Sequence, residues 1–473
     1  MRITRILRTI REQGIVRKKT VDAGDCRKNR IPGKVRKAAV ILFWLLLWQL
    51  LAAAVGNRLL VVGPWETLVR ASALLREREF YMAVAMSLVR IGAGFLAGFA
   101  AGAALAALSS RFPAVEQLPA PFMSLLKAVP VASFVVILLI WWGSSFLAAA
   151  ICFLVVLPNS YIHLLEGLKS TDGELREMAQ VFRLPFRTRF FYIYRPALEP
   201  FVSGSLKLSL GMCWKSGVAA EVIGTPALSI GGKLYLSKIY LDTAGVFAWT
   251  AAVFLLSTVF EKAVLRLAKW FFAWQPACGA PASAGETPGP LEVSDLGKSF
   301  GRESGEKRTV LSGISAVYEP GKIYFLNSPS GSGKTTLLRI LAGLVEPDSG
   351  EVSGRKAVSM MFQEDRLCMD YSAVKNVEMV VGDAERAAEA LKRLLSADDL
   401  EKPCRHLSGG MKRRVALARA MEADAGVVLL DEPFTGMDAL TREKAEQYIR
   451  DRQQGRTLII ATHINMQKEE GKG

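Results

Sequence analysis

The chain is poor in the residues that build metal centres and disulfide frameworks. Of its 473 residues, three are histidines and six are cysteines. The cysteines are scattered along the sequence, at Cys26, Cys152, Cys213, Cys278, Cys368 and Cys404. They form no CxxC pair and have no histidine cluster beside them, so the sequence indicates neither a zinc site nor a disulfide framework. With so few histidines, catalysis by a histidine-bound metal is not expected.

Apolar residues, in contrast, are abundant and unevenly distributed. They make up 51% of the chain and gather before about residue 275, while the remainder is typical of a charged globular domain. The length is also too great for one ordinary domain. We therefore expect an apolar N-terminal part and a separate globular C-terminal part.

The net charge of +16 is concentrated at the N-terminus. A run of arginines and lysines begins at Arg2 and ends at Lys37, just before an apolar segment that starts at Ala38. Basic residues beside a membrane span are held on the cytoplasmic side and attract anionic lipid. We interpret residues 1–38 as a basic cytoplasmic tail that lies against membrane lipid. Nucleic-acid binding by this arm is the alternative, and we do not expect a nucleic-acid partner.

Six stretches are long and apolar enough to cross a membrane, because a spanning helix needs about 20 such residues. They lie near 39–56, 82–108, 120–142, 145–166, 197–221 and 246–270. The basic region before the first is far longer than that of a signal peptide. Six spans place the tail, the loop at 167–196 and everything after residue 271 on one side, the cytosol. We therefore predict an all-α transmembrane bundle of about six spans over residues 39–274.

Two of these spans contain residues that are unusual for a lipid-facing helix. The second has glycines at four-residue intervals, at Gly94, Gly98 and Gly102. This spacing favours close helix packing. The fifth carries Lys207, Lys215 and Glu221 in or beside it. Charges at membrane depth usually face a cavity or a partner, so these three are candidates for a transport pathway, with snorkelling or interfacial placement as the alternative.

A change in composition marks the end of the apolar part. The segment QPACGAPASAGETPGP, residues 275–290, is rich in proline, alanine and glycine and has almost no large apolar residue. It cannot build a core, and it predicts a flexible linker. We place the domain boundary here, with an α/β domain over residues 291–473.

A phosphate-binding loop is predicted between a strand over Lys322–Leu326 and a helix over Thr335–Ala342. The connecting segment is SPSGSGKTT, residues 328–336. Its glycines let backbone N–H groups point inward, and the helix N-terminus adds a positive dipole. Lys334 is placed to reach the β- and γ-phosphates of a nucleotide, and the Thr335 hydroxyl to bind Mg²⁺. The candidate ATP-binding residues of this loop are Ser330, Gly331, Ser332, Gly333, Lys334, Thr335 and Thr336.

Paired acids end a second apolar strand, in VVLLDEP from Val427 to Pro433. Asp431 is suited to binding Mg²⁺, and Glu432 to polarising an attacking water. An apolar strand that ends in Asp-Glu is common by itself. Downstream of a phosphate loop, however, the pair predicts nucleotide hydrolysis.

The string LSGGM, from Leu407 to Met411, decides the class. It resembles the signature of ABC ATPases, whose serine and glycines at a helix N-terminus bind the γ-phosphate of a nucleotide held by the opposite subunit. That resemblance implies an ATP-binding role for Ser408, Gly409 and Gly410.

Other elements of the ABC family follow in the family's order. Gln363 in MFQEDRL resembles the Q-loop, Asp438 in TGMD the D-loop and His463 in IIATH the switch histidine. Phe300 in GKSF resembles the aromatic residue that stacks on adenine. The resemblance implies a P-loop ABC ATPase over residues 291–473 with ATP and Mg²⁺ as cofactors. Its implied catalytic residues are Glu432, His463 and Gln363, and its implied Mg²⁺ ligands are Thr335, Gln363 and Asp431.

The resemblance extends to the membrane part. Permeases of ABC importers carry, in a cytoplasmic loop, the pattern E-A-A, then Gly, then I-x-L-P, which forms a helix that docks into the ATPase. The loop at 167–196 has Glu177, Ala179, Ile193 and Pro196 at the expected offsets. Arginines occupy the glycine and leucine positions of the pattern, at Arg183 and Arg195. The apolar stretch AVPVASFVVILLIWWG, residues 128–143, resembles permeases of nitrate/sulfonate/bicarbonate (taurine)-type importers.

Together these resemblances imply an ATP-driven importer of a small solute, with permease and ATPase in one chain. The solute would be a nitrate-, sulfonate- or bicarbonate-like anion or a vitamin precursor. An ABC site needs the signature of a second subunit, so a homodimer is implied, as is a separate extracytoplasmic solute-binding protein. The expected location is the cytoplasmic (inner) membrane, with several spans and the ATPase facing the cytosol. An ABC half-transporter exporter and an ATP-gated membrane regulator without transport are the alternatives.

Overall fold

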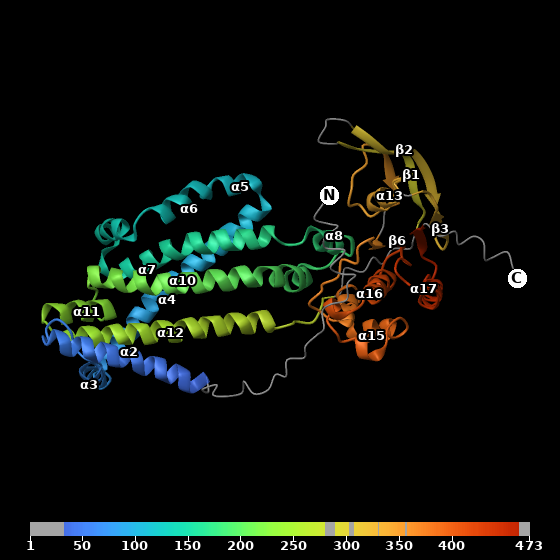
Figure 1. Ribbon diagram of the computed structural model, residues 1–473. Helices are drawn as coiled ribbons and strands as arrows, with labels where there is room; N and C mark the ends of the chain where they lie inside the picture. The colour runs from blue at the N-terminus through green and yellow to red at the C-terminus, as the bar shows by residue number, and fades with distance from the viewer. Residues whose placement is uncertain (1–32, 280–288, 302–306, 330, 355–356, 463–473) are drawn as a thin grey trace, which may run out of the picture. The chain divides into compact units, whose positions relative to one another are not determined.

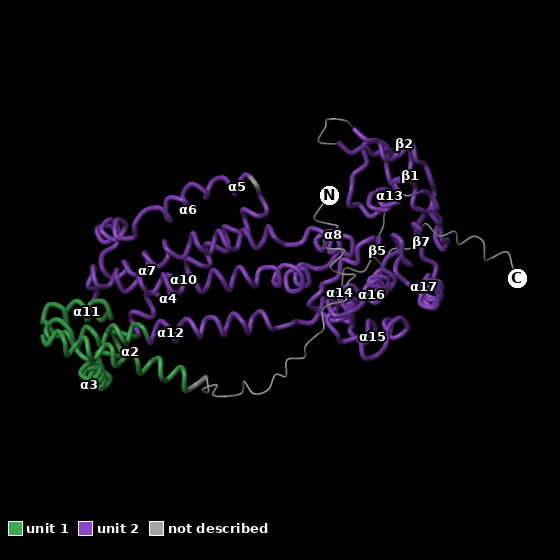
Figure 2. Tube along the Cα trace, viewed as in Figure 1, with its two compact units in different colours: residues 1–84, 228–254 green, residues 85–227, 255–473 purple. Residues whose placement is uncertain are grey.

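The computed structural model describes residues 33–279, 289–301, 307–329, 331–354 and 357–462 (Figure 1). The predicted tail up to residue 32, Ser330 and His463 lie outside the described residues. The chain divides into two compact units, residues 1–84 with 228–254 and residues 85–227 with 255–473 (Figure 2).

The N-terminal part is helical throughout. Its elements are α2 (Gly33–Val55), α3 (Pro64–Leu74), α4 (Arg78–Arg111), α5 (Pro113–Gln117), α6 (Pro119–Ala128), α7 (Val131–Lys169), α8 (Gly173–Val181), α9 (Phe186–Arg189), the π-helical turn η1 (Phe190–Tyr194), α10 (Arg195–Gly224), α11 (Ile230–Ile239) and α12 (Thr243–Ala273). The helical transmembrane class predicted from the sequence is thus confirmed.

The first unit joins α2 and α3 to α11 and the start of α12. The Arg70 guanidinium donates to the Asp242 carboxylate, with Nε and Oδ2 3.0 Å apart. Lys233 of α11 pairs with Glu79 at the start of α4. These ion pairs connect segments that are more than 150 residues apart in the sequence.

Among the described helices, four are long and apolar enough to cross a membrane: Val35–Val55, Arg78–Arg111, Val131–Lys169 and Thr243–Ala273. They overlap the predicted spans near 39–56, 82–108, 145–166 and 246–270. The predicted fifth span corresponds to α10, which has 30 residues but is more polar than these four.

The prediction of one continuous helix over 120–142 was wrong. α6 ends at Ala128, and Val129 is extended, with φ −79° and ψ 130°. Pro130 explains this break, because a residue before proline is disfavoured in the α region. Gly143 then interrupts α7, with φ 72° and ψ −179°. The apolar run is therefore divided into two short helices, each below the roughly 20 residues that a span requires.

Small residues bring α4 and α7 of the second unit into close contact. A Cβ atom added to Gly94 would lie 2.3 Å from the Ala149 carbonyl oxygen, and one added to Gly98 would lie 2.9 Å from the Phe153 carbonyl oxygen. At Gly102 it would lie 2.9 Å from the Tyr161 amide nitrogen. The four-residue glycine spacing therefore serves helix packing, as the sequence predicted.

The C-terminal part is the predicted α/β domain. Its strands are β1 (Leu291–Gly301), β2 (Lys307–Tyr318), β3 (Ile323–Leu326), β4 (Ser349–Ser353), β5 (Val358–Met361), β6 (Val427–Asp431) and β7 (Thr457–Ala461). Its helices are α13 (Lys334–Leu341), α14 (Ala373–Val381), α15 (Ala384–Lys392), α16 (Gly409–Glu422) and α17 (Ala439–Asp451), with short 3₁₀ turns at Ala397–Asp399 and Cys404–His406.

Two sheets organise this domain. One is antiparallel, in the order β2-β1-β4, and the other is parallel, in the order β3-β7-β6-β5. Every residue of β5, β6 and β7 is buried, as expected for parallel strands covered on both faces. β3 and β6 both lead into loops at the carboxyl edge of the parallel sheet, where open α/β sheets bind ligands.

Replacing Gly102 with alanine tests the close approach of α4 to α7. The added Cβ would clash with the Ser160 hydroxyl and with backbone atoms, so we expect the free energy of unfolding to fall by about 1–3 kcal/mol. The measurement is the Tm of the purified chain in detergent micelles. Gly92→Ala in the same helix is the matched control, because no atom lies within 4 Å of its added Cβ. An equal Tm for the two variants would contradict this packing.

Candidate functional site

The loop between β3 and α13 has a backbone that requires glycine. Gly331 and Gly333 have φ values of 80° and 92°, in the left-handed region. At Gly333 a side chain would also lie 2.7 Å from Leu311 and 3.0 Å from the Val310 carbonyl oxygen. The Ser328 and Ser332 hydroxyl oxygens are 2.7 Å apart and form a hydrogen bond across the loop. The loop ends at the N-terminus of α13, where the unpaired backbone N–H groups of the first helical turn favour binding of an anion.

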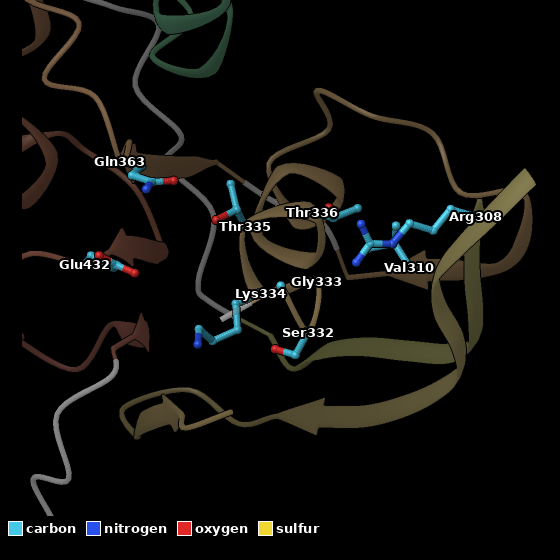
Figure 3. A pocket seen from close by; sticks show the side chains of 10 residues that line it. Arg308, Val310, Ser332, Gly333, Lys334, Thr335, Thr336, Gln363 and Glu432 are labelled. Carbon is cyan, nitrogen blue, oxygen red and sulfur yellow. The ribbon is translucent and has the colours of Figure 1, made fainter. Parts of the chain in front are cut away.

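The loop borders a cavity of about 330 Å³. Its lining joins residues 331–336 to Arg308, Val310, Gln363 and Glu432 (Figure 3). The volume is within the usual range for a small-molecule site. The structure therefore brings the predicted residues Gly331, Ser332, Gly333, Lys334, Thr335 and Thr336 together with the predicted Gln363 and Glu432.

Lys334 is held inside the loop. Its ammonium donates to the carbonyl oxygens of Ser328 and Pro329, the latter 3.4 Å away, and the residue is 9% exposed. A buried ammonium that rests on loop carbonyls lies next to the helix N-terminus. It adds positive charge where the backbone already favours an anion.

Asp431 lies at the carboxyl end of β6 and is 1% exposed. Burial raises the pKa of its carboxyl, and the hydrogen bond with Thr335 partly opposes this change. Its Oδ2 atom is buried and has no hydrogen-bond partner among the described residues. Mg²⁺ prefers oxygen ligands, and the Asp431 carboxylate oxygen and the Thr335 hydroxyl together offer two of them. The predicted Mg²⁺ residues Thr335, Gln363 and Asp431 thus fit the ion chemically.

Glu432 follows directly and has an unusual backbone. Its φ is 49°, which is uncommon for a residue other than glycine. The Glu432 amide donates to the Ala461 carbonyl oxygen at 2.9 Å, and its carboxylate accepts from the Thr435 hydroxyl at 3.2 Å. These contacts hold the chain where the Glu432 carboxylate borders the cavity opposite the phosphate loop (Figure 3).

Arg413 of α16 links the acidic strand end to the Q-loop. Its guanidinium donates to the carbonyl oxygens of Phe362 and Gln363 at 2.7 and 2.8 Å. It also donates to those of Asp431 and Glu432 at 2.6 and 2.7 Å. Sequence reasoning missed this residue. No pattern of side chains marked it, because α16 buries Arg419 and Glu422 as well as Arg413, which is only 5% exposed.

The predicted signature and D-loop residues lie apart from the cavity. Ser408 is the N-cap of α16, where its hydroxyl accepts from the Met411 amide at 3.3 Å. Asp438 is the N-cap of α17 and accepts from the Thr441 amide at 2.8 Å, and this bond lowers the pKa of its carboxyl. Neither these two residues nor Gly409 and Gly410 are among the described residues that line the cavity. The chain therefore carries a phosphate loop and a signature helix that do not meet.

Phe300 also lies outside the described lining. It is on β1, 44% exposed, and pairs across the ladder with Arg308, which does border the cavity. A side chain here is accessible to a flat ring bound at the cavity's edge.

The loop between α7 and α10, predicted to be cytoplasmic, packs directly on the α/β domain. Glu177 of α8 accepts from Arg339 and from Arg366, each at 2.7 Å. Arg339 is on the helix that follows the phosphate loop, and Arg366 is three residues after Gln363. The buried residues Ala179 and Ile193 belong to one apolar core with residues of this domain. Pro196 is in the first turn of α10.

The two arginines that depart from the family pattern have structural explanations. Arg183 replaces a glycine and has φ 50°, the left-handed conformation for which glycine is the usual choice. Arg195 replaces a leucine and is 2% exposed. Its guanidinium donates to the carbonyl oxygens of Phe271, at 2.9 Å, and Trp274, and so satisfies the C-terminal end of α12. Arg195 therefore fixes the start of α10 to the end of α12.

The beginning of the predicted linker is packed rather than free. The Tyr192 hydroxyl donates to the Pro276 carbonyl oxygen. Cys278 is 7% exposed, belongs to the same apolar core and donates its amide to Glu378 of α14 at 3.5 Å. Burial raises the pKa of the Cys278 thiol to about 12. Residues 280–288 of this segment lie outside the described residues.

Two family models match the chain. The model described as "ABC transporter" matches residues 311–435. The model described as "Binding-protein-dependent transport system inner membrane component" matches residues 94–272. The two matches fall on the α/β domain and on the helical part.

Curated relatives resemble the α/β domain. The chain is 41% identical over 179 residues to "Aliphatic sulfonates import ATP-binding protein SsuB 2" of Pseudomonas syringae pv. syringae, covering 37% of this chain and 64% of that protein. It is 39% identical over 201 residues to "Aliphatic sulfonates import ATP-binding protein SsuB 1" of Rhizobium johnstonii, covering 39% of this chain and 71% of that protein. The chain thus spans about two thirds of the length of these relatives, 64% of the first and 71% of the second. Among solved structures, a dimeric ATP-binding cassette bound to ADP and Pi is 27% identical, with coverage of 37% of this chain and 88% of that one. The TM-score of this match is 0.35.

Replacing Arg413 with lysine tests its role as the link between the acidic strand end and the Q-loop. A lysine keeps the charge but lacks the fork that donates to several carbonyls at once. We expect the buried carbonyls to lose their donors, the free energy of unfolding to fall by about 1–3 kcal/mol, and ATP hydrolysis to decrease. Thermal unfolding and phosphate release of the purified chain measure the two effects. Lys412→Gln is the matched control on the same turn of α16. Wild-type behaviour of Arg413→Lys would contradict the assignment.

Proposed function

Because this chain belongs to the ABC transporter family and carries a permease and an ATPase in one polypeptide, we propose that it is an ATP-driven importer of a small organic anion, an aliphatic sulfonate. One observation carries the proposal. Glu177 of the membrane part is hydrogen-bonded to arginines that flank both the phosphate loop and the Q-loop of the ATP site. A motor and a membrane bundle joined in this way are suited to coupled transport.

ATP would bind with its phosphates at the N-terminus of α13. Lys334 and the loop amides would hold the β- and γ-phosphates, and Phe300 would stack on adenine. Thr335, Gln363 and Asp431 would hold Mg²⁺, which supplies charge neutralisation at the phosphates when bound. Glu432 would orient and polarise the attacking water, with His463 and Gln363 as the further catalytic residues. The raised pKa of Asp431 supports this assignment, since a bound cation would offset its buried charge.

A second copy of the chain would complete each site. The signature residues Ser408, Gly409 and Gly410 do not line the chain's own cavity among the described residues, and Ser408 and Gly409 are exposed. In a homodimer they would reach the γ-phosphate held by the partner, as would Asp438 across the same interface. ATP binding would then favour the closed pair of motors, and hydrolysis would release it.

The loop from α8 to η1 would carry this closure to the spans. Glu177, Ala179 and Ile193 would move with the ATPase through their contacts, and Pro196 is in the first turn of the helix that would continue into the membrane. The permease would lie in the cytoplasmic membrane over residues 39–274, after a basic tail at 1–38 that contacts lipid. The linker at 275–290 would lead to an ATPase over residues 291–473 that faces the cytosol.

Import and the choice of cargo rest on the comparisons. The permease part matches a family described as binding-protein-dependent, so we propose a separate extracytoplasmic solute-binding protein as a partner. The curated relatives are named for the import of aliphatic sulfonates. We therefore favour a sulfonate over nitrate, bicarbonate or a vitamin precursor.

Glu432→Gln tests the motor. Loss of the polarising carboxylate should reduce ATP hydrolysis by about 100-fold or more, while binding of MgATP is retained. Phosphate release and fluorescent-nucleotide binding, measured on the full chain in nanodiscs, separate the two. Glu443→Gln is the control, because Glu443 is an exposed residue of α17. Hydrolysis at the wild-type rate in Glu432→Gln would refute the role.

The same variant tests the direction and the cargo of transport. A native host that lacks this chain is complemented with the wild type or with Glu432→Gln, and uptake of labelled ethanesulfonate is measured. We expect uptake with the wild type only. Undiminished uptake without the chain, or efflux driven by it, would contradict import of a sulfonate.

A further inference from the structure

One face of α10 is exposed along the middle of the helix. Its members recur every three or four residues and include two glycines, an alanine and two lysines, beside the apolar side chains of Leu208 and Met212. They are Gly204, Lys207, Leu208, Gly211, Met212, Lys215 and Ala219. No atom lies within 4 Å of a Cβ added at Gly204 or Gly211, so the space in front of this face is open.

The opposite face of α10 is packed. Leu210, Cys213 and Trp214 are at most 2% exposed. A Cβ at Gly217 would lie 2.8 Å from the Cys152 sulfur, so here the glycine serves close packing. The open glycines of the other face have no such neighbour, and their small size needs a different explanation.

The three charged candidates of this span are separated by the structure. Glu221 is 0% exposed, accepts from the Ser87 hydroxyl at 2.7 Å and lies 3.8 Å from the Arg90 guanidinium. It therefore has partners within the bundle. Lys207 and Lys215 are on the exposed face and have no ion pair or hydrogen bond to a side chain among the described residues.

The depth of Lys207 argues against a lipid-facing position, and Lys215 is on the same face. The 30 residues of α10 extend over about 45 Å, half as long again as the hydrocarbon layer of about 30 Å. With the helix centred in that layer, Lys207 lies about 4 Å and Lys215 about 8 Å from the midplane. Lys207 would need to reach about 11 Å to leave the hydrocarbon, further than its four-carbon stem extends. An unpaired ammonium at this depth requires water or an anion in front of it.

We infer that this face of α10 lines a water-filled path between two copies of the chain, and that Lys207 and Lys215 bind the anionic group of the cargo there. The homodimer and the import direction are those of the proposed function. The exposed lysines and the open space in front of the glycines are observed independently of that proposal. Two lysines separated by eight residues lie on one face about 12 Å apart, so they form successive attractive positions for a sulfonate or another small anion. Glycines between them leave room for the cargo to pass.

Thiol labelling in membranes tests the path without knowledge of the binding protein. Cysteine is introduced singly at Lys207, Gly211 or Lys215 in a full-length Cys26→Ser chain, whose five described native cysteines are buried. The probes are a sulfonate-bearing and a trimethylammonium-bearing methanethiosulfonate. Each forms a disulfide with the cysteine thiolate and releases methanesulfinate. Leu255→Cys is the lipid-facing control, on an exposed apolar position of α12.

We expect all three α10 positions to react with both water-soluble probes, and Leu255→Cys to react no faster than the parent chain. At Gly211→Cys, which keeps both lysines, the anionic probe should be favoured over the cationic one on the order of tenfold, relative to a free thiol. Adding Lys207→Gln should reduce that preference several-fold, whereas Lys269→Gln, which removes an exposed lysine from α12, should not.

Each outcome decides one part of the inference. No labelling at all three α10 positions would overturn the path. Labelling without charge preference would overturn the anion site and leave the path. Neither result affects ATP hydrolysis by the chain, so failure here is distinguishable from failure of the proposed function. Retained hydrolysis in each cysteine variant shows that the labelled chain is folded.

Discussion

The connection between the membrane part and the ATPase depends on one contact, the carboxylate of Glu177 held between Arg339 and Arg366. Hydrogen bonds to charged groups contribute about 1.5–3 kcal/mol each, and this carboxylate makes two. The Arg366 side chain is 4% exposed and lies over the Phe362 ring. If Glu177 were removed, little water could reach the Arg366 guanidinium to solvate its charge. Because the arginines flank the phosphate loop and the Q-loop, a change at either reaches the membrane part through the same carboxylate.

Buried arginines extend this connection through the ATPase. Arg413 holds the backbone of the Q-loop to the backbone of the acidic strand end. Arg419 donates to the carbonyl oxygens of Asp365 and Arg366, and its guanidinium lies 5.3 Å from the ring of Phe182, which is in the loop between α7 and α10, here named the coupling loop. Burial lowers the pKa of Arg419 to about 10, which leaves it charged at neutral pH. Guanidinium–carbonyl bonds thus connect the Q-loop, the acidic strand end and the signature helix, while the Phe182 ring contact and the Glu177 carboxylate connect them to the membrane part.

The sequence predicted those parts whose chemistry is local. The glycine-rich loop between a strand and a helix could be predicted, as could the apolar strand that ends in Asp-Glu. Both are recognised from the order and spacing of neighbouring residues alone. The break at Val129–Pro130 was missed because the apolar residues over 120–142 are numerous enough to predict a span despite one proline. Arg413 was missed because its acceptors are backbone atoms up to 51 residues away, which no pattern of side chains marks. Likewise, Arg183 gave no sign that it keeps the backbone conformation of the glycine it replaces.

The most direct test follows the ATP-driven movement of the coupling loop. A spin label at Arg187→Cys, an exposed position, is placed in a Cys26→Ser, Glu432→Gln chain, and the distance between the labels of two copies is measured with and without MgATP. We predict that ATP shortens this distance. Adding Glu177→Arg places a third positive charge beside Arg339 and Arg366, so it should abolish most of the shortening while ATP stays bound. The control, Glu174→Arg on the exposed side of α8, should leave the shortening unchanged. The same shortening in Glu177→Arg would contradict the account.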